Sequence, residues 1–87
     1  MAEVIVYTTD YCPYCTRAKG LLQRKKIDFV EINVSNDPGK RAWLVEATKR
    51  RTVPQIFING KAIGGSDELH ALERDGKLDA MIAADHS

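Results

Sequence analysis

The sequence predicts an α/β fold in which helices flank a mixed four-stranded sheet, and three observations support this prediction. Short apolar, β-branched runs alternate with helix-like segments in the order β-α-β-α-β-β-α. An Asn59-Gly60 pair separates two of these runs, as in a tight β-hairpin. The chain has 87 residues, 44% of them apolar, which suits one small core. We therefore expect a single domain over residues 1–87.

The first half of the chain predicts a right-handed βαβ unit with parallel strands. The run Val4–Tyr7 is typical of a strand buried on both faces. A helix is expected from Pro13, because proline suits the first helical turn. Residues 29–34 predict the second strand. The apolar stripe of the helix is expected to contain Cys15, Ala18, Leu21 and Leu22.

The second half predicts a helix, an antiparallel hairpin and a final helix. Asp37 followed by Pro38 is a helix-start signal. The hairpin strands are expected over residues 55–58 and 61–63. Ser66 is expected to cap the last helix. Its inward residues are expected to be Leu69 and Leu72, followed after Gly76 by Leu78, Met81 and Ile82.

Charge and composition exclude several classes of protein. The formal net charge is +1 and only six residues are aromatic, which argues against a dedicated nucleic-acid binder. The N-terminus lacks a basic, apolar leader and no run is long enough to cross a bilayer, so we expect a cytoplasmic protein with no membrane partner. Residues 1–51 hold ten Lys and Arg against six Asp and Glu, an excess that would attract a small anion.

The only two cysteines, Cys12 and Cys15, form a C-x-x-C motif. A disulfide between them would close too small a loop to stabilise the fold, so the pair indicates redox chemistry or metal binding. At the start of the predicted helix, Cys12 would favour the thiolate form, with added charge from Arg17 and Lys19. Cys12 is therefore the predicted attacking thiol, and Cys15 the resolving thiol.

Metal binding is the alternative reading of this pair. A structural zinc site needs four ligands, and beyond the cysteines the chain offers His70, His86 and carboxylates. Copper chaperones also carry a C-x-x-C near the N-terminus, but their order is β-α-β-β-α-β. The Asn-Gly hairpin near the C-terminus does not fit that order. We expect no metal site.

Three motifs occur in sequence: Cys12-Pro13-Tyr14-Cys15, Thr52-Val53-Pro54 and Gly64-Gly65-Ser66-Asp67. With these motifs, roughly residues 3–83 resemble a dithiol glutaredoxin of the C-P-Y-C type, most similar to the bacterial glutaredoxin 3 group. The resemblance implies a thioredoxin-like fold. It also implies a glutathione-dependent oxidoreductase that reduces protein–glutathione mixed disulfides and protein disulfides.

The resemblance further implies how glutathione is bound near the thiols. Tyr14 would lie beside the tripeptide. The backbone N–H and C=O of Val53, before a cis Pro54, would pair with the cysteinyl part like an added strand. Thr52 would support that loop.

The other end of glutathione is assigned by the same resemblance. Gly65 would let the backbone come close, while Ser66 and Asp67 would hold the γ-glutamyl carboxylate and ammonium. The family commonly has a lysine where this chain has Thr9. In the family, that lysine binds the glycine carboxylate of glutathione. Arg41 lies at a second position where the family places a carboxylate-binding side chain, and it would bind this carboxylate in place of the lysine.

The resemblance implies no permanently bound cofactor, with glutathione as the electron-donating co-substrate. The partners would be glutathione, disulfide-containing or glutathionylated proteins and, indirectly, glutathione reductase, with the protein a monomer. Two alternatives remain open. One is an iron–sulfur-binding or scaffold protein, with the Cys12 thiolates of two subunits and two glutathiones around a cluster. The other is a redoxin reduced by thioredoxin reductase.

Overall fold

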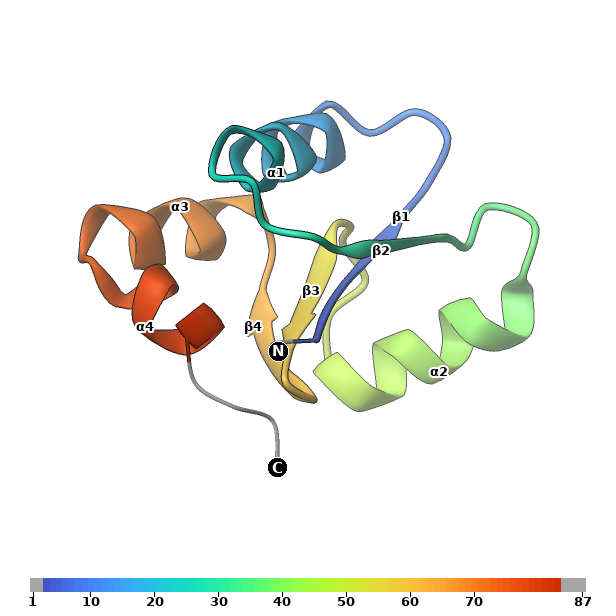
Figure 1. Ribbon diagram of the computed structural model, residues 1–87. Helices are drawn as coiled ribbons and strands as arrows, with labels where there is room; N and C mark the ends of the chain where they lie inside the picture. The colour runs from blue at the N-terminus through green and yellow to red at the C-terminus, as the bar shows by residue number, and fades with distance from the viewer. Residues whose placement is uncertain (1–2, 84–87) are drawn as a thin grey trace.

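One mixed sheet of four strands forms the centre of the computed structural model, which describes residues 3–83 (Figure 1). The strands are β1 (Val4–Thr8), β2 (Val30–Asn33), β3 (Gln55–Ile58) and β4 (Lys61–Gly64). Their order across the sheet is β2-β1-β3-β4. As predicted, β1 and β2 are parallel and the β3–β4 hairpin is antiparallel, and β1 also pairs antiparallel with β3.

Helices cover both faces of this sheet, as predicted (Figure 1). They are α1 (Pro13–Arg24), α2 (Pro38–Thr48), α3 (Ser66–Arg74) and α4 (Lys77–Ala83). Both proline-led starts are confirmed. The Asp37 side chain caps α2, because its Oδ1 accepts a hydrogen bond from the Lys40 backbone N–H at 2.9 Å.

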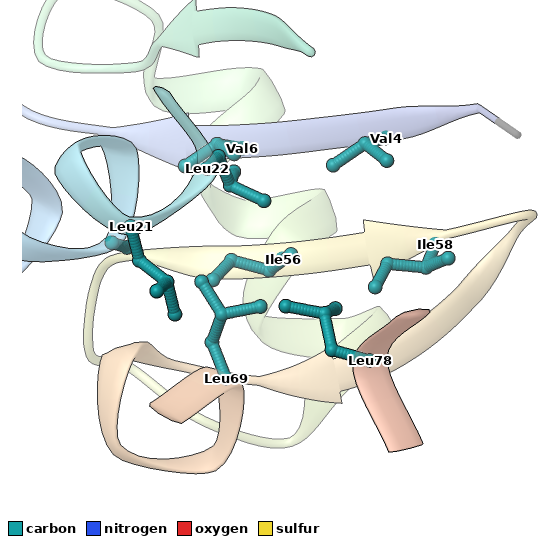
Figure 2. Close-up of a cluster of buried hydrophobic side chains, with 9 residues drawn as sticks. Val4, Val6, Leu21, Leu22, Ile56, Ile58, Leu69 and Leu78 are labelled. Atoms are coloured by element: carbon teal, nitrogen blue, oxygen red, sulfur yellow. The ribbon is translucent and has the colours of Figure 1, made fainter. Parts of the chain in front are cut away.

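The main core lies between the sheet and the helices α1, α3 and α4. In Figure 2, side chains from β1 and β3 meet leucines from these three helices. The cluster contains Val4, Val6, Ala18, Leu21, Leu22, Ile56, Ile58, Leu69 and Leu78. The alternation of side chains along each strand accounts for this packing, since every second residue faces α1 and α3. The predicted stripe on α1 is thus confirmed as its buried face.

A smaller core lies on the opposite face, beneath α2. It is built on Tyr7, Val34 and Leu44. The ring of Tyr7 packs 5.7 Å from that of Trp43 and 5.6 Å from that of Phe57, measured between centroids. Strand β1 is therefore buried on both faces, as its apolar run predicts.

Two details of the C-terminal third differ from prediction. The last helix is interrupted at Gly76, whose φ of 72° is left-handed, so α3 ends and α4 begins as a separate helix. Leu78 still enters the main core. Ser66 is the first residue of α3 rather than its cap, because Gly65 occupies the N-cap position. The Glu68 carboxylate accepts a hydrogen bond from the Gly65 N–H there, at 2.8 Å.

The hairpin turn agrees with prediction. Asn59 and Gly60 have φ values of 52° and 81°, the two positive angles that a type I′ turn requires. Within residues 3–83, the helices are too short and too polar to span a bilayer.

Candidate active site

The two cysteines lie where strand β1 gives way to helix α1, and they form a disulfide. Their Cα atoms are 5.1 Å apart, within the usual range for such a bond. Cys12 is the N-cap of α1 and its Sγ lies 3.1 Å from the Cys15 backbone nitrogen, whose N–H points at it. Cys12 is half-buried, whereas Cys15 is only 2% exposed. An incoming sulfur can therefore reach Cys12 but not Cys15.

The segment before β3 forms one side of the dithiol. The Val53–Pro54 peptide bond is cis, as the resemblance predicts. The Val53 carbonyl oxygen lies 3.5 Å from Cys12 Sγ. The buried Gln55 side chain fixes this segment, because its amide nitrogen donates to the Thr52 carbonyl oxygen at 2.8 Å and lies 3.3 Å from Thr52 Oγ1. The backbone of Val53 is thus held beside the reactive sulfur.

The N-terminus of α3 approaches this segment closely. A Cβ atom placed on Gly65 would lie 3.1 Å from the Pro54 carbonyl oxygen, so a larger residue would push the two segments apart. Ser66 is buried and Asp67 is exposed at the start of the helix. The first backbone N–H groups of a helix suit a carboxylate.

A hollow of about 210 Å³ lies between these segments. Its lining consists of Tyr14, Arg50, Thr52, Gly65, Ser66, Asp67 and Glu68. It is smaller than the roughly 300 Å³ at which ordinary ligand pockets begin, so it suits one end of a peptide-sized ligand. Five of the predicted glutathione contacts are brought together here.

Arg50 and Glu68 also line the hollow, although neither was predicted from the sequence as a site residue. Arg50 Nη1 donates to Glu68 Oε1 at 2.6 Å. The pKa of Glu68 is lowered, first by the hydrogen bond from the Gly65 N–H and then by Arg50. The spacing of Glu68 three residues after the N-cap was an available signal for its capping role. Arg50 had no local signal, because its partner is 18 residues away.

Arg41 does not line the hollow, but it lies near the same edge of the sheet. It is exposed in the first turn of α2. The loop that precedes α2 is tied to the loop that precedes Cys12, since the Asp10 N–H donates to Ser35 Oγ at 2.8 Å and Asn33 Nδ2 donates to Asp10 Oδ1 at 2.9 Å. The role of Arg41 in carboxylate binding stays a prediction.

The two cations expected to support the thiolate have different surroundings. Lys19 Nζ pairs with Glu31 Oε2 at 3.0 Å, which lowers the pKa of Glu31, and Thr8 Oγ1 donates to the same oxygen at 2.8 Å. The charge of Lys19 is thus largely offset. The Arg17 guanidinium lies 5.9 Å from the centroid of the Tyr14 ring, at cation–π distance. Arg17 therefore brings positive charge to the rim of the hollow.

Comparison with known proteins agrees with this geometry. The sequence profile of one family, Glutaredoxin, matches residues 4–63. The chain belongs to the glutaredoxin family. It is 55% identical to a glutaredoxin of Pseudomonas aeruginosa over 84 residues, covering 97% of this chain and all of the relative (100%). Its identity with glutaredoxin 3 of Escherichia coli K12 is 45% over 82 residues, covering 94% of this chain and 99% of the relative.

Solved glutaredoxin structures confirm the thioredoxin-like fold. The solution structure of a Brucella melitensis glutaredoxin is 51% identical, with a TM-score of 0.86, and the match covers 94% of this chain and 89% of that one. A crystal structure of a buckwheat glutaredoxin–glutathione complex is 36% identical, with a TM-score of 0.87 and coverage of 91% and 74%. This glutaredoxin is a glutathione-dependent thiol–disulfide oxidoreductase with a redox-active cysteine pair.

No metal-binding cluster accompanies the thiols in the part of the chain that the structure describes. Groups of three or more His, Cys, Asp or Glu side chains with suitable spacing are absent from residues 3–83. His86, one of the zinc ligands considered above, lies outside the described residues.

Proposed function

We propose that this glutaredoxin reduces protein–glutathione mixed disulfides and protein disulfides, with Cys12 as the nucleophile and Cys15 as the resolving thiol. The observation that carries the proposal is the placement of Cys12. Cys12 is only half-buried, and its sulfur caps a helix N-terminus and lies 3.5 Å from the Val53 carbonyl oxygen, while Cys15 is buried one turn further on. The backbone N–H of Cys15 points at the sulfur and stabilises its negative charge.

On a mixed disulfide, the Cys12 thiolate attacks the glutathione sulfur. A Cys12–glutathione disulfide forms, the original disulfide breaks, and the substrate sulfur leaves as a thiolate that takes up a proton. A second glutathione thiolate then attacks the glutathione sulfur on Cys12. Glutathione disulfide leaves and the Cys12 thiolate is restored. The net reaction consumes one glutathione: the substrate sulfur is reduced to a thiol, and the sulfur of that glutathione is oxidised as it enters glutathione disulfide.

On a protein disulfide, Cys12 first forms a mixed disulfide with the substrate. Cys15 then attacks the Cys12 sulfur, which releases the substrate dithiol and closes the Cys12–Cys15 disulfide seen here. Two glutathione molecules return this disulfide to the dithiol. The bond closes only a short loop at the start of α1, so it forms and breaks without rearranging the core.

The hollow beside Cys12 supports binding of glutathione. In the proposed pose, the Val53 backbone pairs with the cysteinyl part next to Cys12, and Tyr14 covers the tripeptide. The N-terminus of α3 takes the γ-glutamyl carboxylate through its backbone amides. Asp67, exposed in that turn, takes the ammonium group.

We extend the proposal to the protein's setting. A lone C-x-x-C pair that must cycle between two states suits a reducing compartment such as the cytoplasm, where glutathione reductase regenerates the donor. One sheet with both faces covered suits a single domain over residues 1–87 acting as a monomer.

An assay of the wild-type protein identifies its electron donor. We expect turnover of a glutathionylated peptide when glutathione, glutathione reductase and NADPH are supplied, followed as NADPH oxidation. With thioredoxin reductase and NADPH alone, we expect no turnover. The reverse pattern would assign the chain to the redoxins served by thioredoxin reductase. A charge-transfer absorption band in anaerobically purified protein, lost in Cys12→Ser, would instead support the iron–sulfur alternative, which no observation on residues 3–83 favours.

Replacing Arg41 with alanine is expected to raise the KM for a glutathionylated peptide by about three- to tenfold, with kcat within about twofold. The reason is that a cation at this edge of the sheet would contact a substrate carboxylate in both ground and transition states. Steady-state kinetics provide the test. Arg24→Ala, which removes the same charge at the far end of α1, is the control and should change neither constant. An unchanged KM in Arg41→Ala would remove Arg41 from the site.

A further inference from the structure

Two segments far apart in sequence form the walls of the hollow next to Cys12. One precedes β3 and carries Thr52 and Val53, and the other is the N-terminus of α3. The Arg50–Glu68 ion pair, 2.6 Å long, joins the two segments. The same oxygen of Glu68 also accepts the Gly65 N–H at 2.8 Å. A single carboxylate oxygen therefore connects one wall to the first backbone amide of the other.

Exposure argues that this ion pair has little to do with stability. The Arg50 and Glu68 side chains are 48% and 39% exposed, and ion pairs at such sites contribute little to the free energy of unfolding. Among residues 3–83, Glu68 is the one hydrogen-bonding partner of the Arg50 guanidinium. Both residues line the hollow, so the pair is expected to affect the shape of the hollow and the binding of ligand there.

Glutathione would touch both walls at once. Its cysteinyl part would pair with Val53, and its γ-glutamyl end would lie on the amides that follow Gly65. Such two-point binding needs a fixed distance between the walls, since a ligand that must order its own site loses affinity. The Arg50–Glu68 ion pair joins the two walls and so fixes that distance.

We propose that Arg50 is a positioning residue that acts through Glu68: it holds the N-terminus of α3 in register with the Thr52–Pro54 segment so that both ends of glutathione are bound together. This inference rests on the proposed function of the hollow. It assigns Arg50 no contact with the reacting sulfurs. Arg50 also offsets the negative charge of Glu68 next to the amides that would receive a carboxylate.

A double-mutant cycle distinguishes positioning from direct substrate contact. The variants are Arg50→Ala, Glu68→Ala and the double variant, assayed with a glutathionylated peptide. We expect each single change to raise KM about three- to tenfold, with kcat within about twofold of the wild type. Because Arg50 acts only through Glu68, the double variant should have the same KM as Glu68→Ala alone. Arg50→Lys should recover part of the loss, and Arg24→Ala, which removes an exposed cation at the far end of α1, should have no effect.

Three results would overturn the proposal. If Arg50→Ala still raises KM when Glu68 is already alanine, Arg50 contacts the substrate directly. If KM is unchanged in either single variant, the pair does not position the site. If the thermal unfolding midpoint falls along with kcat, the role is structural. Alkylation of reduced Cys12 by iodoacetamide, which needs no glutathione site, should keep its wild-type rate in all variants. Failure of the wild type to turn over the peptide would instead overturn the proposed function itself.

Discussion

Replacing Cys12 with serine is expected to lower turnover of a glutathionylated peptide at least about a thousandfold, because the other thiol, Cys15, is buried. A serine hydroxyl in the same place remains protonated at neutral pH and cannot form a disulfide. The measurement is NADPH oxidation in the coupled assay with glutathione and glutathione reductase. Cys12 and Cys15 are the only cysteines in the chain, so any residual activity would have to use Cys15.

Cys15→Ser is the matched control for that experiment. We expect it to retain most of the activity on the glutathionylated peptide, since a second glutathione can resolve the Cys12–glutathione disulfide. It should lose the reduction of a protein disulfide that depends on intramolecular release. Near-wild-type activity in Cys12→Ser, or equal loss of peptide turnover in both variants, would contradict the assignment of the two thiols.

Replacing Ile56 with alanine is expected to lower the free energy of unfolding by about 2–5 kcal/mol. Ile56 is fully buried in the central strand β3, among leucines from α1 and α3 (Figure 2). Small domains have a total stability near the lower end of about 5–15 kcal/mol, so this change would leave little or none of it. Urea unfolding followed by circular dichroism measures the loss.

The control for this change is Val30→Ala. Val30 lies in the edge strand β2 with 57% of its surface exposed, so its truncation should cost less than about 1 kcal/mol. If Ile56→Ala lowered the free energy of unfolding no more than Val30→Ala does, the packing between the sheet and α1 would not be a main source of stability.

Local signals account for most of what was predictable. Pro13 and Pro38 mark the starts of two helices, and this signal depends only on residues of the first helical turn. Asn59-Gly60 specifies its turn through the backbone angles of these two residues alone. The apolar stripe of α1 follows from helical periodicity. These features depend on residues within a few positions of one another, and the structure confirms each of them.

The predictions failed where the local structure depends on a contact with a residue far away in the sequence, or on a competing local contact. Ser66 was predicted to cap α3 by residue type, yet Gly65 occupies that position because the Glu68 carboxylate binds its N–H and Pro54 leaves no room for a side chain. The break at Gly76 could not be predicted from apolar periodicity, because the residues on both sides of it follow a helical pattern. The Arg50–Glu68 pair joins segments that only the folded chain brings together.

Trapping the covalent Cys12–glutathione intermediate tests the role of Cys12 most directly. Reduced Cys15→Ser protein is mixed with glutathione disulfide, and the intact protein and its proteolytic peptides are analysed by mass spectrometry. We expect one glutathionyl group per chain, on Cys12, which added glutathione then removes. No adduct, or an adduct on any other residue, would contradict this role.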